Sequence, residues 1–243
     1  GAAAAAAGIA GLVGDCSARE VQLQATKRFR IVDASLLTPQ ELSDNQPDMD
    51  LMVRAVPARL GDCDAFISHS WHDSGDAKWK AFRQWCDEFR AKHGREPRVW
   101  IDKCCIDQGN IEADLRCLPL FLHGCSTLVL LCGVTYLSRL WTVVELFTFV
   151  HMGGRIENIH LVPVLRECSP AEDLRMIKRA FRKFDARHCE CTKSQDKEKM
   201  LGIIHAAFGT MDRFNMEVYR LLAQVGGEDA QSDSSESEEE SDC

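Results

Sequence analysis

The sequence predicts an α/β protein built on a doubly wound parallel sheet of four or five strands with helices on both faces. The first observation is a set of short, continuous apolar runs, among them Ala65-Phe66-Ile67 and Thr127 to Leu131. Runs of this kind are typical of strands that are buried on both faces of a parallel sheet. The second observation is the spacing, because segments of about 25 to 30 residues with a helical apolar stripe separate successive runs, as in βαβ crossovers.

The central strand is expected at residues 64–68, followed by a polar loop and a helix. The helix is indicated by Trp79, Phe82, Cys86 and Phe89 at helical spacing, with Lys78 and Arg83 on the polar side. In open α/β sheets the ligand crevice lies outside the carboxyl ends of the strands. We therefore expect four candidate binding residues at this end of the strand: Ser68, His69, Ser70 and Trp71.

Three further strands follow from the same pattern. Residues 98–102 and 127–131 are expected to flank the central strand, and residues 160–165 form a fourth strand. Pro163 lacks a backbone donor, which favours a position near the sheet edge. A later helix is marked by Leu174, Ile177, Phe181 and Phe184, and a last one runs from about 197 to 222 with possible breaks at Gly202 and Gly209.

The chain divides into four parts by composition. Residues 1–16 are a low-complexity arm of Gly, Ala and aliphatic residues, expected to be disordered. Residues 17–60 are an extension expected to pack on the core, with a strand near 29–32 and a helix that Thr38 begins as cap. Residues 61–225 form the main domain. Residues 226–243 are acidic and rich in Ser, and are expected to be a disordered tail.

Charge and cysteine usage narrow the class of protein. The formal net charge is −8, and the acidic residues of the last sixteen positions account for all of it. The body is therefore neutral, which favours neither nucleic acid nor an anionic membrane as partner. No apolar run approaches the roughly 20 residues of a membrane span. The 12 cysteines are irregularly spaced and lack zinc-ligand spacing, so we expect reduced thiols, a cytoplasmic location and no metal.

Several α/β protein classes are excluded because the chain lacks their motifs. The chain contains neither the Gly-x-x-x-x-Gly-Lys-Ser/Thr pattern of P-loops nor a Gly-x-Gly-x-x-Gly pattern after its first strand. A phosphoacceptor receiver domain requires Asp at the end of the third strand, and Leu131-Cys132-Gly133 stands there.

Four segments resemble the boxes of Toll/interleukin-1 receptor (TIR) domains. In family order they are the first-strand box, the second strand with its BB loop, the αC signature and the fourth-strand box: residues 64–70 (DAFISHS), 99–102 with 107–109 (VWID and DQG), 138–146 (SRLWTVVEL) and 161–164 (LVPV). They span about residues 62–168. Residues 100–108 and 138–145 are also similar to fungal heterokaryon-incompatibility (HET) domains. The resemblance implies a flavodoxin-like, TIR-like fold.

The resemblance implies two possible functions. Some TIR domains cleave the nicotinamide–ribose bond of NAD, with the αC Glu as essential residue, which is Glu145 here. NAD would then be a substrate, contacted by residues of the matching boxes: Ser68, His69, Ser70, Trp71, Asp102, Asp107 and Trp141. Other TIR domains only self-associate or bind related domains through the BB loop. The sequence departs from several NAD-cleaving members, because Ser70-Trp71 stands where they carry a basic residue for phosphate.

Each candidate residue also has a purely structural interpretation. Glu145 lies about 40° from Trp141 around a helix, so it borders the apolar stripe and could instead pair with Arg139. Trp71 could stack on a ligand ring or pack in the core. His69 and Ser70 could cap the loop, and Asp102 and Asp107 could stabilise turns. Cys104 and Cys105 have no evident His and acid partners, so we do not expect a thiol nucleophile.

Overall fold

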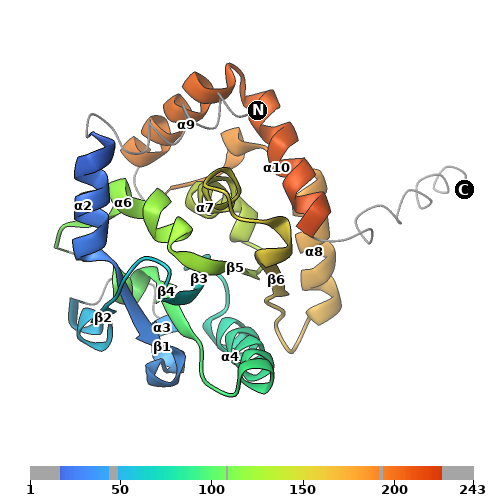
Figure 1. Cartoon of the computed structure of the whole chain (residues 1–243). Helices are drawn as coiled ribbons and strands as arrows, with labels where there is room; N and C mark the ends of the chain where they lie inside the picture. The colour runs from blue at the N-terminus through green and yellow to red at the C-terminus, as the bar shows by residue number, and fades with distance from the viewer. Residues whose placement is uncertain (1–16, 44–48, 108, 192–193, 226–243) are drawn as a thin grey trace, which may run out of the picture.

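A six-stranded, mostly parallel sheet forms the centre of the molecule (Figure 1). The computed structural model describes residues 17–43, 49–107, 109–191 and 194–225. The strand order is β2-β1-β4-β3-β5-β6, with β3 to β6 parallel to one another, β1 antiparallel to β4, and β2 antiparallel to β1. The strands are β1 (Arg30–Asp33), β2 (Val56–Pro57), β3 (Cys63–His69), β4 (Arg98–Ile101), β5 (Cys125–Cys132) and β6 (Ile159–Pro163).

The predicted core of the sheet is confirmed. Strand β3 is central among the parallel strands and pairs with β4 on one side and β5 on the other, with Ile67 opposite both Ile101 and Val129. Strand β6 lies at the edge beyond β5, and Pro163 is its last residue. An edge position needs fewer ladder donors, which is why a proline is tolerated there.

The predicted number of strands is wrong, because the sheet has six strands rather than four or five. The two additional strands come from the N-terminal extension. Strand β1, expected near residues 29–32, pairs antiparallel with β4 through Val32 and Val99, and β2 pairs with β1. The extension therefore continues the sheet beyond β4.

Helices cover both faces of the sheet, and alternation along β3 decides which side chain meets which helix. Phe66 stacks on Trp100 at a ring distance of 4.3 Å, and Trp100 contacts Phe121 of α6, so one face looks towards α6 and α7. On the opposite face, Trp85 of α4 donates a hydrogen bond to His160 of β6 at 3.0 Å. Because successive side chains of a strand alternate, Ser68 shares the face of Phe66, and His69 points to the other face.

A helix is present at each place where a helical stripe or cap was named in the sequence, and the structure adds further helices. Helix α4 starts after Ser74, whose hydroxyl accepts from the Ala77 amide, and ends at Gly94 in the left-handed region with φ of 71°. The helices are α2 (Ala18–Arg28), α3 (Pro39–Ser43), α4 (Gly75–His93), α5 (Asp102–Cys105), α6 (Ile111–His123), α7 (Leu140–His151), α8 (Pro170–Arg182), α9 (Ser194–Phe208) and α10 (Met211–Val225). One detail of α4 differs, since Lys78 was placed on the polar side and is fully buried.

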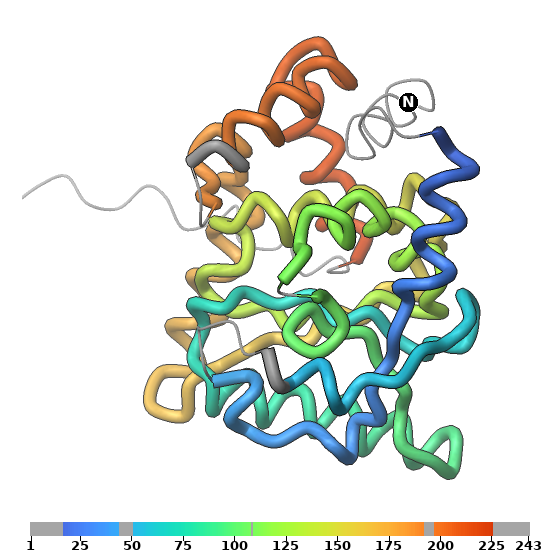
Figure 2. The backbone as a smooth tube through the Cα atoms, turned by 90° about the vertical axis from the view of Figure 1, so that its left-hand side faces the viewer, coloured from blue at the N-terminus to red at the C-terminus, as the bar shows by residue number. Residues whose placement is uncertain are grey.

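The last predicted helix is two helices. Helices α9 and α10 meet at Gly209, whose φ of +76° is a left-handed conformation that side-chain-bearing residues rarely adopt. Gly202 lies inside α9 and causes no break. Both views place α9 and α10 at one end of the molecule and α4 at the other, with the sheet between them (Figures 1 and 2).

Some expectations fall on other residues or outside the described ranges. The possible strand at 189–192 is represented by one bridge between Arg139 and Glu190. The arm at 1–16 and the tail at 226–243 lie outside the described residues. Among the helices of the described ranges, none is long and apolar enough to cross a membrane.

Candidate functional site

The side chain of Glu145 lies beside the carboxyl end of the central strand. Helix α7 presents it towards β3, where the Ser68 hydroxyl donates a hydrogen bond to its Oε2 at 2.5 Å. Ser68 is buried and Glu145 is half-buried. The sequence also allowed a pairing of Glu145 with Arg139. In the structure the Arg139 guanidinium instead lies 3.7 Å from the Glu190 carboxylate. The candidate catalytic carboxyl therefore has a defined neighbour on the strand predicted to carry the site.

Burial changes the acidity of Glu145. Desolvation raises its pKa to about 8, and the nearby Asp102 carboxylate acts in the same direction. The hydrogen bond from Ser68 opposes both effects by stabilising the charged form. Titratable groups with shifts of this size are concentrated at functional sites, although structural networks produce them as well.

Tyr136 extends this contact into a chain of three side chains. Its Oη lies 2.7 Å from Ser68 Oγ, and the tyrosine is fully buried in the short 3-10 turn η3 (Tyr136–Ser138). Desolvation and the Glu145 carboxyl raise the pKa of Tyr136 well above its usual value, so the phenol keeps its proton. Tyr136, Ser68 and Glu145 thus form one hydrogen-bonded row between η3, β3 and α7.

His69 and Trp71 form a second group around Asp102. The His69 Nε2 lies 3.1 Å from Asp102 Oδ1, and the Trp71 indole donates to Oδ2 at 2.7 Å. Burial acts to raise the pKa of Asp102, but His69 and these hydrogen bonds outweigh it, so the pKa is below its ordinary value. Asp102 therefore fixes the ring of Trp71, and it also acts electrostatically on Glu145.

Two lysines bring positive charge to this edge. The Lys103 ammonium lies 4.7 Å from the centroid of the Trp71 ring, a cation–π distance. The Lys78 ammonium donates to the backbone carbonyl of Ser70 at 2.9 Å and approaches that of Trp71 at 3.4 Å. Desolvation lowers the pKa of Lys78 to about 8, against the favourable charges of Asp73 and Asp102. Lys78 thereby holds the backbone of the loop that carries Trp71.

Ser70 joins the loop after β3 to the loop after β5. Its hydroxyl lies 2.7 Å from the Thr135 hydroxyl, and Asp73 accepts from the Thr135 amide at 2.9 Å and from its hydroxyl at 2.8 Å. The buried Asp73 carboxylate sits where a Cβ at Gly133 would be, so a side chain at that position would displace the carboxylate. Ser70 is engaged in loop structure, as its non-catalytic interpretation stated.

Asp107 and Trp141 lie outside these two groups. The Asp107 carboxylate lies 3.6 Å from Arg28 and accepts from the Gly109 amide, while its own amide donates to the buried Asp114 at 2.7 Å. Arg28 of α2 binds Asp114 at 2.5 Å, so α2 anchors the loop after α5. Trp141 is half-buried and packs against the hydrophobic core.

Sequence reasoning missed four residues of the site: Tyr136, Asp73, Lys78 and Lys103. A buried tyrosine needs a partner for its hydroxyl, which would have pointed to Tyr136. The sequence did not show that Tyr136 is buried, so this signal could not be used. Lys78 and Lys103 gave no signal, since lysines are usually exposed and both are buried here.

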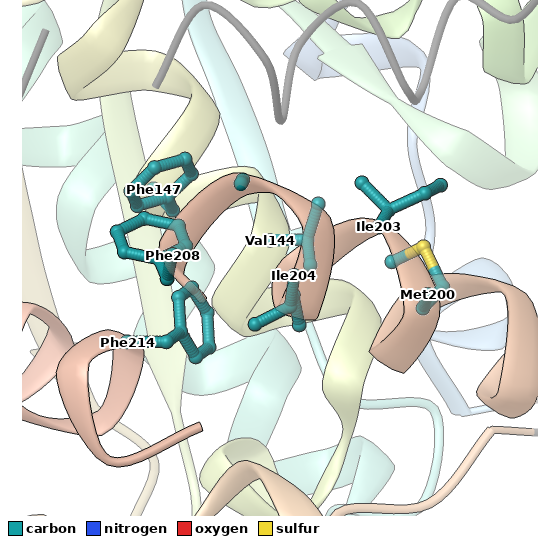
Figure 3. A pocket seen from close by; sticks show the side chains of 8 residues that line it. Val144, Phe147, Met200, Ile203, Ile204, Phe208 and Phe214 are labelled. Carbon is teal, nitrogen blue, oxygen red and sulfur yellow. The ribbon is translucent and has the colours of Figure 1, made fainter. Parts of the chain in front are cut away.

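An apolar pocket lies on the opposite side of α7, between α7, α9 and α10 (Figure 3). Its cavity volume is about 20 Å³, room for a water-sized molecule, and Phe147, Phe208 and Phe214 stand edge to face at one end. Its lining atoms are apolar, so it offers no group for acid–base or nucleophilic chemistry. The candidate site is therefore the polar end of the sheet.

Burial suppresses the reactivity of most cysteines in the part of the chain that the structure describes. The ten that the structure describes are free thiols, and most are buried. Burial raises the pKa of Cys104 to about 12 and that of Cys105 well above its usual value, which suppresses the thiolate. Within the described ranges, no three His, Cys, Asp or Glu side chains are grouped as metal ligands.

The site thus combines a half-buried carboxyl that is hydrogen-bonded to a row of hydroxyls with an indole ring that Asp102 holds at the same end of the sheet. A carboxylate in such a position can stabilise positive charge that develops on a bound sugar, and an indole ring can stack on a flat heterocycle. Comparison of the chain with protein-family models, with curated proteins and with solved structures gave no match.

Proposed function

We propose that the chain is a TIR-like signalling domain that hydrolyses the nicotinamide–ribose bond of NAD, with Glu145 as the essential residue. The observation that carries the proposal is the contact of Glu145 with Ser68 at the carboxyl end of the central strand. The strand order adds support. When the four parallel strands are numbered along the chain, their order across the sheet is 2-1-3-4. This order agrees with the flavodoxin-like order expected of a TIR-like fold.

The reaction needs no metal and few protein groups. The bond between the ribose C1′ and the nicotinamide nitrogen breaks, and its electron pair goes to the ring nitrogen, which becomes neutral. The ribose passes through an oxocarbenium-like transition state, and water then adds to C1′ and releases one proton. An ionised Glu145 near the ribose would stabilise the developing positive charge.

The neighbouring groups fit the rest of the substrate in kind. The Trp71 ring, held by Asp102, is a surface for the nicotinamide or adenine ring. The chain has no basic residue directly after Ser70. Lys103 beside the Trp71 ring is a positive charge, but it is buried, so it would attract a phosphate through its field rather than by direct contact.

The acidity of Glu145 gives the proposal a pH signature. Because its pKa lies at about 8, only a minority of molecules carry the ionised form at pH 7. If the ionised form is required, the rate of nicotinamide release should rise about tenfold from pH 6 to pH 7 and level off above pH 8.

The decisive experiment compares the wild type with Glu145→Ala and Glu145→Gln. Purified protein is incubated with NAD, and released nicotinamide is quantified, both in concentrated solution and on a multimerising scaffold. Both substitutions should reduce release at least 100-fold, since one positioned charge contributes about 3 to 4 kcal/mol to a barrier. A wild type that neither binds NAD nor releases nicotinamide under both conditions contradicts the proposal.

The alternative is a non-catalytic module that self-associates or binds related domains through the loop after α5. The observation in its favour is the anchoring of Asp107 by Arg28 and Asp114, which fixes this loop on the surface of α2 and α6. Asp107→Ala or Ile111→Asp should then weaken association measured by light scattering, because both side chains are accessible. Ile106 is buried, so its substitution tests stability instead. In this case Glu145→Ala leaves association unchanged.

A further inference from the structure

The row of Tyr136, Ser68 and Glu145 has a direction that the chemistry of its groups imposes. The Ser68 hydroxyl has one hydrogen to donate and accepts through its lone pairs. Its Oγ lies 2.7 Å from Tyr136 Oη and 2.5 Å from Glu145 Oε2. An ionised carboxylate only accepts, so Ser68 must donate to it, and the tyrosine must then donate to Ser68.

When Glu145 is protonated, this order is no longer imposed. The neutral carboxyl carries a hydrogen of its own and can donate it to Ser68, whose hydrogen is then free to turn towards Tyr136. Two arrangements of the same three groups therefore exist, and the ionised carboxylate requires the one in which the tyrosine is the donor. Hydrogen bonds in a chain polarise one another, so the tyrosine strengthens the bond that Ser68 makes to the carboxylate.

The tyrosine is held in place independently of Glu145. It is fully buried, and its backbone carbonyl accepts from the Thr142 hydroxyl at 2.7 Å, which fixes η3 to the first turn of α7. The Arg139 carbonyl lies 2.8 Å from the same hydroxyl and shares its single hydrogen. The donor end of the row is thus rigid, while Glu145 at the other end is half-buried.

We propose that Tyr136 is a positioning residue which, through the Ser68 hydroxyl, orients the Glu145 carboxylate and stabilises its ionised form. The relay deepens the proposed NAD hydrolysis and, where catalysis is concerned, rests on it. Tyr136 touches neither the substrate nor the reacting atoms in this account. Its hydroxyl acts on the reaction only through Ser68.

Other titratable groups also affect the pKa values of Glu145 and Tyr136, so a test must leave those groups unchanged. Asp102 raises the pKa of Glu145, and Asp73 and Cys132 raise that of Tyr136. Substitutions confined to the hydroxyls of Ser68 and Tyr136 leave all three groups in place. They remove only the row itself.

The experiment titrates Glu145 directly in the full chain. The side-chain carboxyls of Glu are labelled with carbon-13, and the Glu145 signal is identified by its loss in Glu145→Gln. We expect the Glu145 carboxyl of the wild type to titrate with a midpoint near pH 8. The midpoint should rise by about one pH unit in Ser68→Ala and by about half a unit in Tyr136→Phe. The chain has two tyrosines, so Tyr219→Phe, an exposed position, is the matched control and should leave the midpoint unchanged.

A double substitution separates the relay from a direct effect of the phenol. Without the Ser68 hydroxyl the tyrosine has no route to the carboxylate, so Ser68→Ala with Tyr136→Phe should titrate like Ser68→Ala alone. Additive shifts would overturn the relay. A shift in Tyr136→Phe no larger than in Tyr219→Phe would overturn the role of Tyr136 altogether.

A second measurement avoids any loss of packing. In the Tyr219→Phe background, 3-fluorotyrosine labels Tyr136 alone and makes its hydroxyl a stronger donor. The Glu145 midpoint should then fall by a few tenths of a pH unit, and a rise or no change contradicts the proposal. Both titrations read the carboxyl whether or not NAD is cleaved. Failure of the proposed hydrolysis would appear only as absent nicotinamide release, and if release occurs, its pH midpoint should move with the titration.

Discussion

The two sides of α7 contrast a polar row with an apolar pocket. Towards β3, Glu145 accepts a hydrogen bond from Ser68 at 2.5 Å, and Ser68 in turn lies 2.7 Å from the Tyr136 hydroxyl. Towards α9 and α10, Val144 and Phe147 line a pocket whose contacts are apolar. The first side depends on the position of single atoms, whereas the second depends on volume filled. Substitutions on the two sides should therefore differ in kind as well as in size.

The largest effect is expected on the apolar side. Phe214 is fully buried and packs edge to face against Phe147 and Phe208, at ring distances of 5.6 and 5.2 Å. Phe214→Ala should lower the free energy of unfolding by about 3 to 5 kcal/mol, through lost burial and the cavity that remains. Urea denaturation followed by circular dichroism measures it. Phe214→Leu is the control and should cost about 1 to 2 kcal/mol; equal costs would show that volume does not govern this side.

A single methyl group should be felt strongly at the polar end. In Gly133→Ala the new Cβ would overlap the carboxylate of Asp73, which holds Thr135 through two hydrogen bonds. We expect a loss of about 1 to 3 kcal/mol in the free energy of unfolding. The matched control is Gly202→Ala inside α9, where nothing lies within 4 Å. It should stabilise by about 0.5 to 1 kcal/mol, and the comparison breaks if both changes have the same sign.

The polar row should also make stability depend on pH. The pKa of Glu145 is about 8 in the folded protein against an ordinary 4.5, so the folded state keeps a proton that the unfolded chain releases. This contribution is complete below about pH 4.5 and is lost as the pH rises through 8. Relative to Glu145→Gln, the wild type should lose about 2 kcal/mol of unfolding free energy between pH 5 and pH 6.5. Parallel unfolding curves of the two proteins across this range would contradict the assigned acidity.

The smallest effect concerns Trp71, which borders both solvent and site. Trp71→Phe removes the indole donor to Asp102 and should cost about 1 kcal/mol of unfolding free energy at pH 7. Trp79→Phe is the control, since the ring of Trp79 contacts Phe82 and Arg83. It should cost less than the change at Trp71, as measured by urea denaturation. The reverse order would mean that packing rather than the hydrogen bond holds Trp71.

The parallel core of the sheet was predictable because it depends on local apolar runs. Residues 65–67 and 128–131 are apolar without interruption, which fixes both their strand character and their burial on two faces. The two extra strands were not predictable in number. Val56-Pro57 is too short to carry a pattern, and only its pairing with β1 makes it a strand.

The candidate site was predictable in part for a similar reason. Ser68 and His69 follow an apolar strand, and their place at its carboxyl end follows from the strand alone. Their partners depend on long-range contacts, because Ser68 meets Glu145 across 77 positions and Tyr136 across 68. Nothing local distinguishes a buried Lys78 from an exposed one. The identity of the carboxyl was suggested by the TIR resemblance, and its acidity required the packing around it.

The antiparallel strand β1 also has a consequence for experiments on assembly. It occupies the outer edge of β4, through the pairs Val32 with Val99 and Asp33 with Arg98. A fragment trimmed to residues 61–225 would leave that edge without its hydrogen-bonding neighbour, and unpaired sheet edges recruit strands from other chains. Such a fragment would aggregate through edge pairing, and this aggregation would resemble signalling assembly in a light-scattering trace. Association should therefore be measured on protein that retains residues 17–60.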